Sequence, residues 1–142
     1  MKDSKAVLDG ILSSVQMGQL GIRSVLDKAI RVELRKDLHS QLSEYDSIET
    51  QAQNIAKKHN WQLKEVNPAI KAMSNMMSRA KLSVGPRDSK IAAMMIQGNT
   101  RGMILGYKDL HKNQRLDPEV KQLSHKLLET EKSNIEQMQG YL

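Results

Sequence analysis

Residues 32–59, VELRKDLHSQLSEYDSIETQAQNIAKKH, are the most regular amphipathic stretch of the chain. Apolar side chains return every three or four residues, at Leu34, Leu38, Leu42, Tyr45, Ile48, Ala52 and Ile55. This spacing predicts one helix of 28 residues, about 42 Å long at 1.5 Å per residue. Because one face of so long a helix is apolar, other helices are expected to cover it.

Similar apolar patterns on both sides of this stretch predict further helices over residues 4–29, 68–82, 89–112 and 118–140. Three dipeptides, Asn67-Pro68, Asp88-Ser89 and Asp117-Pro118, stand where helices are expected to begin and provide capping residues.

The lengths of the connections predict the topology. The first two long helices follow each other almost directly, and about four residues join the last two, whereas nearly 30 residues separate the two pairs. Short links join antiparallel neighbours, and a long link permits a crossover. The sequence therefore predicts a single all-α domain over residues 1–142: a ferritin-like up-down four-helix bundle with a long crossover that contains the short helix 68–82.

Composition excludes several classes of site. The chain has 142 residues and no cysteine, so disulfides, thiolate metal sites and thiol catalysis are excluded. Phenylalanine is also absent, and nine methionines provide core volume in its place. A thioether copper site at Met73, Met76 and Met77 is the alternative interpretation of the methionines. The longest apolar run, residues 91–96, is far shorter than the roughly 20 residues of a spanning helix. We expect no membrane insertion, no signal peptide in the first residues, and a cytoplasmic location.

The positive charge is concentrated in one part of the chain. The net charge is +6, and residues 60–90 carry six basic against two acidic side chains. The basic residues are Lys64, Lys71, Arg79, Lys81, Arg87 and Lys90. Such a patch is either a solvated face or a surface for nucleic acid. Single-strand binders also stack bases on aromatic rings, and aromatic residues are few here.

Three glycines, Gly98, Gly102 and Gly106, stand four apart in the expected helix 89–112. Each costs roughly 1 kcal/mol relative to alanine in a helix interior, so the row needs a reason. Close helix packing is one reason, and room for a ligand is another. We favour packing against the first helix, where Gly18 and Gly21 are counterparts, or against a second copy in a homodimer.

Ferritin-like metal sites need four carboxylates and two histidines, arranged as single glutamates and Glu-x-x-His pairs. The expected helices offer Glu44 and Glu131, but serine and asparagine stand where the two histidines would be. His125 and Glu129, four residues apart, form a further candidate pair. The sequence therefore predicts no catalytic site, no metal and no cofactor, with these four residues as the remaining candidates.

Several stretches resemble a known family. The residues Leu34-Arg35-Lys36-Asp37-Leu38, followed by Leu42, Glu44, Ile48, Ala52 and Asn60-Trp61, resemble a helix of small bacterial ferritin-like proteins, notably spore-coat F-like proteins. Residues 129–142, ETEKSNIEQMQGYL, are similar to the last helix of that group, and residues 94–102 resemble uncharacterised clostridial relatives. The resemblance implies a four-helix bundle with a structural or sporulation-linked role, and a spore-coat location. Its metal positions carry over to Glu44 and Glu131 alone.

These observations favour a non-enzymatic helical protein that self-associates and has a structural or protein-interaction role. A metal-binding or redox protein with an atypical site and a basic nucleic-acid-associated bundle are the alternatives.

Overall fold

The computed structural model describes residues 2–65, 87–113 and 115–142. This part of the chain contains four α-helices, one short 3₁₀ helix and no strand. The helices are α1 (Lys2–Val25), α2 (Val32–His59), α4 (Arg87–Lys112) and α5 (Pro118–Gln139), and the 3₁₀ helix η1 (Leu26–Lys28) follows α1. The helix expected over residues 68–82 lies outside the described residues, as do the three methionines of the copper alternative.

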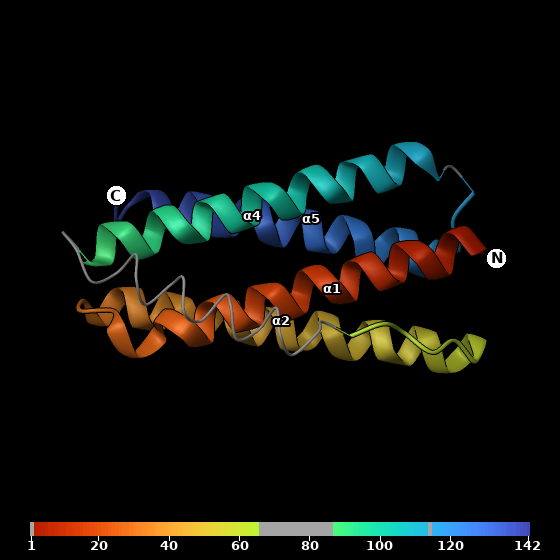
Figure 1. The fold of residues 1–142 in the computed structure, drawn as a ribbon, viewed down its shortest axis with the longest axis horizontal. Helices are drawn as coiled ribbons and strands as arrows, with labels where there is room; N and C mark the ends of the chain where they lie inside the picture. Colours follow the sequence, from red (N-terminus) through yellow and green to blue (C-terminus); the bar gives the residue numbers. More distant parts are fainter. Residues whose placement is uncertain (1, 66–86, 114) are drawn as a thin grey trace.

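The four helices form a bundle of two antiparallel hairpins, α1 with α2 and α4 with α5 (Figure 1). α1 also packs on α4, and α2 on α5, so the neighbours around the bundle are antiparallel. α2 ends and α4 begins at opposite ends of the bundle, and the two run in the same direction (Figure 1). The all-α bundle and the order of its hairpins thus agree with the prediction from link lengths.

The core fills the space between the apolar faces of the four helices. Its large side chains that are less than 2% exposed include Leu8, Leu12, Ile22, Leu34, Leu38, Ile48, Ile91 and Met138. Burying each contributes about 1.5–3 kcal/mol to the free energy of folding. None of the described helices is long and apolar enough to cross a bilayer.

Helix ends follow the sequence in two cases. Asp117 caps α5 by accepting a hydrogen bond from the Glu119 N–H at 2.9 Å, with Pro118 as the first helical residue. α2 has the predicted bounds and ends at Asn60, whose φ of 56° places it in the left-handed region that asparagine tolerates. The capping signal Asp117-Pro118 is therefore confirmed.

Two other ends differ from the prediction. The first helix was expected to reach Ala29, but it tightens into the η1 turn after Val25, and Ala29 is extended. The expected cap residue Asp88 lies inside α4, which begins at Arg87. Its carboxylate instead accepts hydrogen bonds from the backbone N–H groups of Ile30 (2.7 Å) and Arg31 (2.9 Å), just before α2.

Candidate functional site

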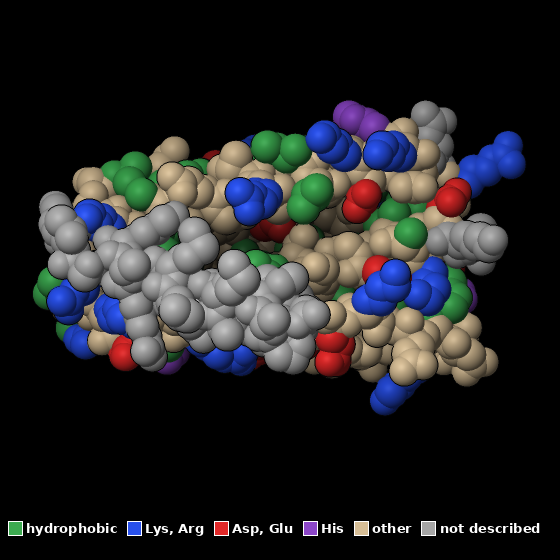
Figure 2. All heavy atoms as spheres, in the orientation of Figure 1, with side chains coloured by type: hydrophobic (Ala, Val, Ile, Leu, Met, Phe, Trp, Pro, Cys, Tyr) green, Lys and Arg blue, Asp and Glu red, His purple; other side chains and the backbone are tan. Residues whose placement is uncertain are grey.

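A cavity of about 260 Å³ lies in the middle of the bundle and opens between α1 and α4. Figure 2 shows the surface hollowed there, with acidic atoms at the bottom of the hollow. All four helices contribute to the lining. The walls are mostly apolar, and they include Met17, Ile22, Met94, Met95 and Leu105. For comparison, an engineered protein cavity of about 150 Å³ holds a benzene molecule.

The glycines shape this cavity rather than a tight contact between the backbones of α1 and α4. A Cβ atom at Gly98 would meet nothing within 4 Å. At Gly102 it would lie 2.6 Å from a carboxylate oxygen of Glu131, and at Gly106 it would lie 2.9 Å from Leu128, both on α5. On α1, a Cβ at Gly18 would lie 2.7 Å from the ring of Tyr45.

The predicted packing of the glycine row against the first helix is therefore corrected for Gly102 and Gly106, which make room for side chains of α5. Gly21 makes an ordinary contact, because its Cβ would lie 3.6 Å from the end of Met95. Gly18, Gly21, Gly98 and Gly102 all line the cavity. A role of this row in a homodimer stays a prediction.

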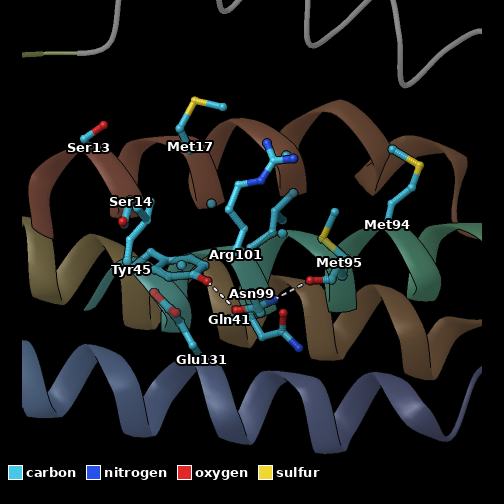
Figure 3. A pocket seen from close by; sticks show the side chains of 16 residues that line it. Ser13, Ser14, Met17, Gln41, Tyr45, Met94, Met95, Asn99, Arg101 and Glu131 are labelled. Atoms are coloured by element: carbon cyan, nitrogen blue, oxygen red, sulfur yellow. Dashed lines mark hydrogen bonds between the residues drawn. The ribbon is translucent and has the colours of Figure 1, made fainter. Parts of the chain in front are cut away.

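A layer of buried polar side chains crosses the bundle beneath the cavity. The Tyr45 hydroxyl donates to Asn99 Oδ1 at 2.8 Å, and Asn99 Nδ2 donates to the Met95 carbonyl at 2.7 Å (Figure 3). Asn134 Nδ2 donates to both Asn99 Oδ1 (3.2 Å) and the Tyr45 hydroxyl (3.3 Å). α2, α4 and α5 are thereby joined by hydrogen bonds that fix the orientation of the Tyr45 ring.

Glu131 lies beside this layer, and one of its carboxylate oxygens has no hydrogen-bond partner among the described residues. Its side chain rises from α5 toward Tyr45 (Figure 3), and the residue is 2% exposed. Its Oε2 atom is buried and accepts no hydrogen bond. Burial raises the pKa of Glu131 from its ordinary 4.5 to about 8. The carboxyl group is therefore mostly protonated at neutral pH.

Gln41 provides a second buried acceptor at the same cavity. Its Nε2 donates to Gln137 Oε1 at 2.7 Å, but its Oε1 atom has no hydrogen-bond partner among the residues that the structure describes. These two oxygens are the buried side-chain atoms of the described residues that lack a hydrogen bond. An unsatisfied buried polar atom costs about 1–3 kcal/mol, so such atoms indicate a missing partner.

Few charged groups of the described residues lie near Glu131. Tyr45 faces it from α2, and burial, followed by the nearby Glu131 charge, raises the pKa of this phenol. Arg101 lines the cavity from α4, is exposed, and places its guanidinium beside α1 (Figure 3). Within the described part of the chain, Arg101 forms no ion pair. The α1 wall has no titratable side chain and provides the hydroxyls of Ser13 and Ser14.

The structure separates Glu131 from the other candidate metal ligands. Glu131 faces the cavity, whereas Glu44 is exposed and lines a polar groove between α2 and α5, together with Glu129 and Lys126. His125 is exposed on α5. In residues 2–65, 87–113 and 115–142, no group of three His, Asp or Glu side chains is placed to hold a metal. Of the two positions carried over from the resemblance, Glu131 thus lies inside the bundle and Glu44 lies at its surface.

The predicted basic patch can be placed only in part. Lys64 and Arg87 are exposed, and Lys90 is half-buried with polar interactions of its own. Lys71, Arg79 and Lys81 lie outside the described residues.

Sequence reasoning passed over most of the site. Gln41, Glu131 and Asn134 stand at core spacing, three or four residues from apolar core positions, and that spacing was the available signal. Asn99 likewise follows Met95 by four residues. Arg101 carries no comparable signal in the sequence.

Comparisons with known proteins give a fold relationship. No protein-family model matches the chain, and no curated protein is significantly similar to it. A DUF305 fragment from Deinococcus radiodurans is similar in structure, with a TM-score of 0.78 and 15% sequence identity. The match covers 99% of this chain and 95% of that fragment. At this identity the likeness concerns the fold alone.

This finding corrects the resemblance drawn from the sequence. The structural neighbour belongs to a different helical family from the ferritin-like and spore-coat F-like proteins, and no family or curated match supports them. The motifs that suggested the resemblance are mainly apolar spacings. Unrelated four-helix bundles share such spacings because their helices must bury the same kind of stripe.

Proposed function

We propose that this chain is a non-enzymatic binding protein that holds a small molecule in the cavity between α1 and α4. The observation that carries the proposal is the pair of buried, unpaired oxygens on Glu131 and Gln41. A ligand with hydrogen-bond donors would satisfy both atoms, and its apolar part would cover the methionine and leucine walls.

The composition of the lining supports binding over catalysis. Among the described residues that line the cavity, one carries a carboxyl group, and none is a histidine or a second acidic residue. A general acid–base pair or an activated nucleophile needs a second group within hydrogen-bond reach. The rigid layer of Tyr45, Asn99 and Asn134 instead provides a fixed floor on which a ligand can rest.

Filling the cavity tests this function. Gly98→Leu adds a side chain where a Cβ meets nothing, whereas Thr100→Leu places the same leucine side chain at an exposed position of the same helix. Small cationic, neutral and anionic aromatic molecules are titrated into each protein while backbone amide signals are followed by NMR. We expect shifts in residues 13–22 and 94–105 for the wild type and Thr100→Leu, and none for Gly98→Leu. No binding at millimolar concentration, or equal binding to Gly98→Leu, would contradict the proposal.

A second candidate function is self-association as a homodimer. Three large apolar side chains stand exposed near the end of α4: Ile104 and Leu105, each 51% exposed, and Tyr107, which is 47% exposed. Such neighbouring side chains are typical of contact surfaces. Sedimentation velocity of the wild type, Ile104→Lys and the control Thr100→Lys tests this candidate. A wild type that is monomeric at every concentration would exclude it, and so would a dimer that Ile104→Lys leaves intact.

Nucleic-acid association through the basic patch stays a prediction. Its test is a binding shift with DNA or RNA at low salt, with an affinity that falls steeply as salt is added.

A further inference from the structure

Resting on the proposed binding function, we infer that the ligand is an amine: a protonated amino group on a compact apolar body, with the amino group against the free oxygens of Glu131 and Gln41. The unpaired buried oxygens, the apolar walls and the charges around the cavity between α1 and α4 all favour this class of ligand.

The two buried side-chain atoms that lack a partner among the described residues are both oxygens, and both act as acceptors once Glu131 is ionised. Glu131 Oε2 and Gln41 Oε1 are both buried and unpaired. The neighbouring donors are already used, since the Tyr45 hydroxyl donates to Asn99 and the Asn134 amide donates to Asn99 and Tyr45. A ligand that fits must therefore donate. An ammonium group offers three N–H donors to such acceptors, whereas an alcohol offers one.

Charge favours the ammonium group over a neutral donor. Glu131 is 2% exposed and has no cation within salt-bridge distance among the described residues. Burial is the cause of its raised pKa, with no opposing contribution from Arg101. A bound cation would restore the carboxylate and form a charge-assisted hydrogen bond, which is roughly twice as strong as a neutral one.

The walls limit the rest of the ligand. Met17, Ile22, Met95 and Leu105 give it an apolar surround, and Gly98 leaves one side open. A volume of about 260 Å³ exceeds the roughly 150 Å³ that holds benzene. A single ring with a short aminoalkyl arm is therefore of suitable size.

Arg101 supports the alternative that the ligand is an anion. Its guanidinium lies beside α1 at the cavity, so a ligand with a carboxylate could bind there instead. Among the described residues, Tyr45 from α2 faces Glu131, Arg101 from α4 lines the same cavity with its guanidinium beside α1, and the α1 wall adds no group that titrates. The two interpretations predict opposite ligand charge, so matched ligands separate them.

The amine hypothesis also predicts a direction of pH dependence. Glu131 has a pKa of about 8 in the empty site, and an amine with a pKa near 10 stays protonated to well above that. Binding requires the carboxylate, so affinity rises with pH until Glu131 is ionised. From the ionised fractions at pH 6 and pH 8, the affinity should rise about fifty-fold. At pH 7, binding should release about 0.9 proton per site.

The test uses the full chain and three probes that share one ring and a two-carbon arm: 2-phenylethylamine, 2-phenylethanol and phenylacetate. Calorimetry is done at pH 6, 7 and 8 on the wild type, Glu131→Gln, Arg101→Gln and the control Glu129→Gln, which is exposed on the same helix. At pH 8 the amine should bind the wild type and Glu129→Gln at least about tenfold more tightly than the alcohol. Glu131→Gln should lose this preference and still bind the alcohol.

Proton release by the wild type, measured in buffers of different ionisation enthalpy, gives a readout that needs no variant. Equal affinity for amine and alcohol, or release of no proton, would overturn the amine inference and leave the binding function standing. Tightest binding of phenylacetate, lost in Arg101→Gln, would replace it with an anion site. If none of the three probes binds any of the proteins, the inference and the proposed function fail together.

Discussion

At the scale of single residues, Glu131 occupies a position of α5 where an apolar side chain would need no partner. It stands at core spacing with Leu127 and Met138, and Gly102 of α4 leaves the space for its carboxyl group. A buried carboxyl group without a partner destabilises the fold when it ionises. The bundle therefore tolerates Glu131 mainly in its neutral form.

This gives a prediction for stability against pH. The folded-state pKa of Glu131 is raised from 4.5 to about 8, so the folded state holds a proton that the unfolded state loses. The penalty is absent below pH 4.5, grows through the window between the two values, and is complete above pH 8. Glu131→Gln removes it. Relative to the wild type, the free energy of unfolding of the variant should rise by about 2 kcal/mol between pH 5.5 and pH 7.5.

Urea unfolding at the two pH values measures this difference. Glu129→Gln, two residues away and exposed, is the matched control and should show no such change. A difference between wild type and Glu131→Gln that is the same at both pH values would show that Glu131 is already ionised.

The glycines give a second prediction, because two of them differ in what a methyl group would meet. Gly98→Ala adds a Cβ in open space and should raise the free energy of unfolding by up to about 1 kcal/mol through helix propensity. Gly18→Ala places a Cβ 2.7 Å from a Tyr45 ring that hydrogen bonds hold in place, and should lower it by about 1–3 kcal/mol. Thermal or urea unfolding of the pair checks both signs. Stabilisation by Gly18→Ala would show that the Tyr45 ring moves freely.

At the scale of elements, Asp88 ties the start of α4 to the chain that enters α2. Its two carboxylate oxygens accept the N–H groups of Ile30 and Arg31. Asp88→Ala should lower the free energy of unfolding by about 1–2 kcal/mol, since both charge-assisted hydrogen bonds are lost at a partly exposed site. Asp3→Ala is the control, because Asp3 lies in the first turn of α1 and interacts with that helix end in the same way. If the free energy of unfolding falls equally in the two variants, the interaction with the helix dipole accounts for the whole effect and the two hydrogen bonds of Asp88 contribute nothing.

The helix bounds could be predicted from the sequence more fully than the contacts between helices. α2 was predicted to the residue because its apolar stripe is unbroken and Asn60 ends it. The role of Asp88 was missed because its backbone partners lie 57 and 58 residues earlier in the chain. The glycine row was noticed, but the helix that faces it depends on how α4 is rotated in the bundle. That rotation is a property of tertiary packing, which apolar spacing within one helix does not determine.

For the candidate site, the burial of its polar residues could be predicted from the sequence, but their hydrogen bonds could not. The polar residues Gln41, Glu131 and Asn134 stand among core positions, so their burial follows from the same periodicity that predicts the helices. Their hydrogen bonds, and the lack of one at Glu131, depend on which side chains of α2, α4 and α5 meet at one level. That information is absent from the pattern of any single helix.

At the scale of the whole molecule, occupation of the cavity should stabilise the bundle. A ligand present at 100 times its dissociation constant contributes about 2.7 kcal/mol when it binds the folded state alone. With 2-phenylethylamine at pH 8, urea unfolding of the wild type should shift by that amount. Gly98→Leu should show no shift, and Thr100→Leu should behave as the wild type does. Stabilisation of Gly98→Leu to the same extent would place the ligand elsewhere.

Ligand binding and the pH dependence of stability both depend on the protonation state of the Glu131 carboxyl group, and carbon-13 NMR of this side chain across pH 4 to 10 measures that state directly. In the free protein we predict a titration midpoint near pH 8, and a midpoint about two units or more lower when 2-phenylethylamine saturates the site. A midpoint near the ordinary value of 4.5 in the free protein would contradict the account, because Glu131 would then have a partner or solvent that the cavity does not provide.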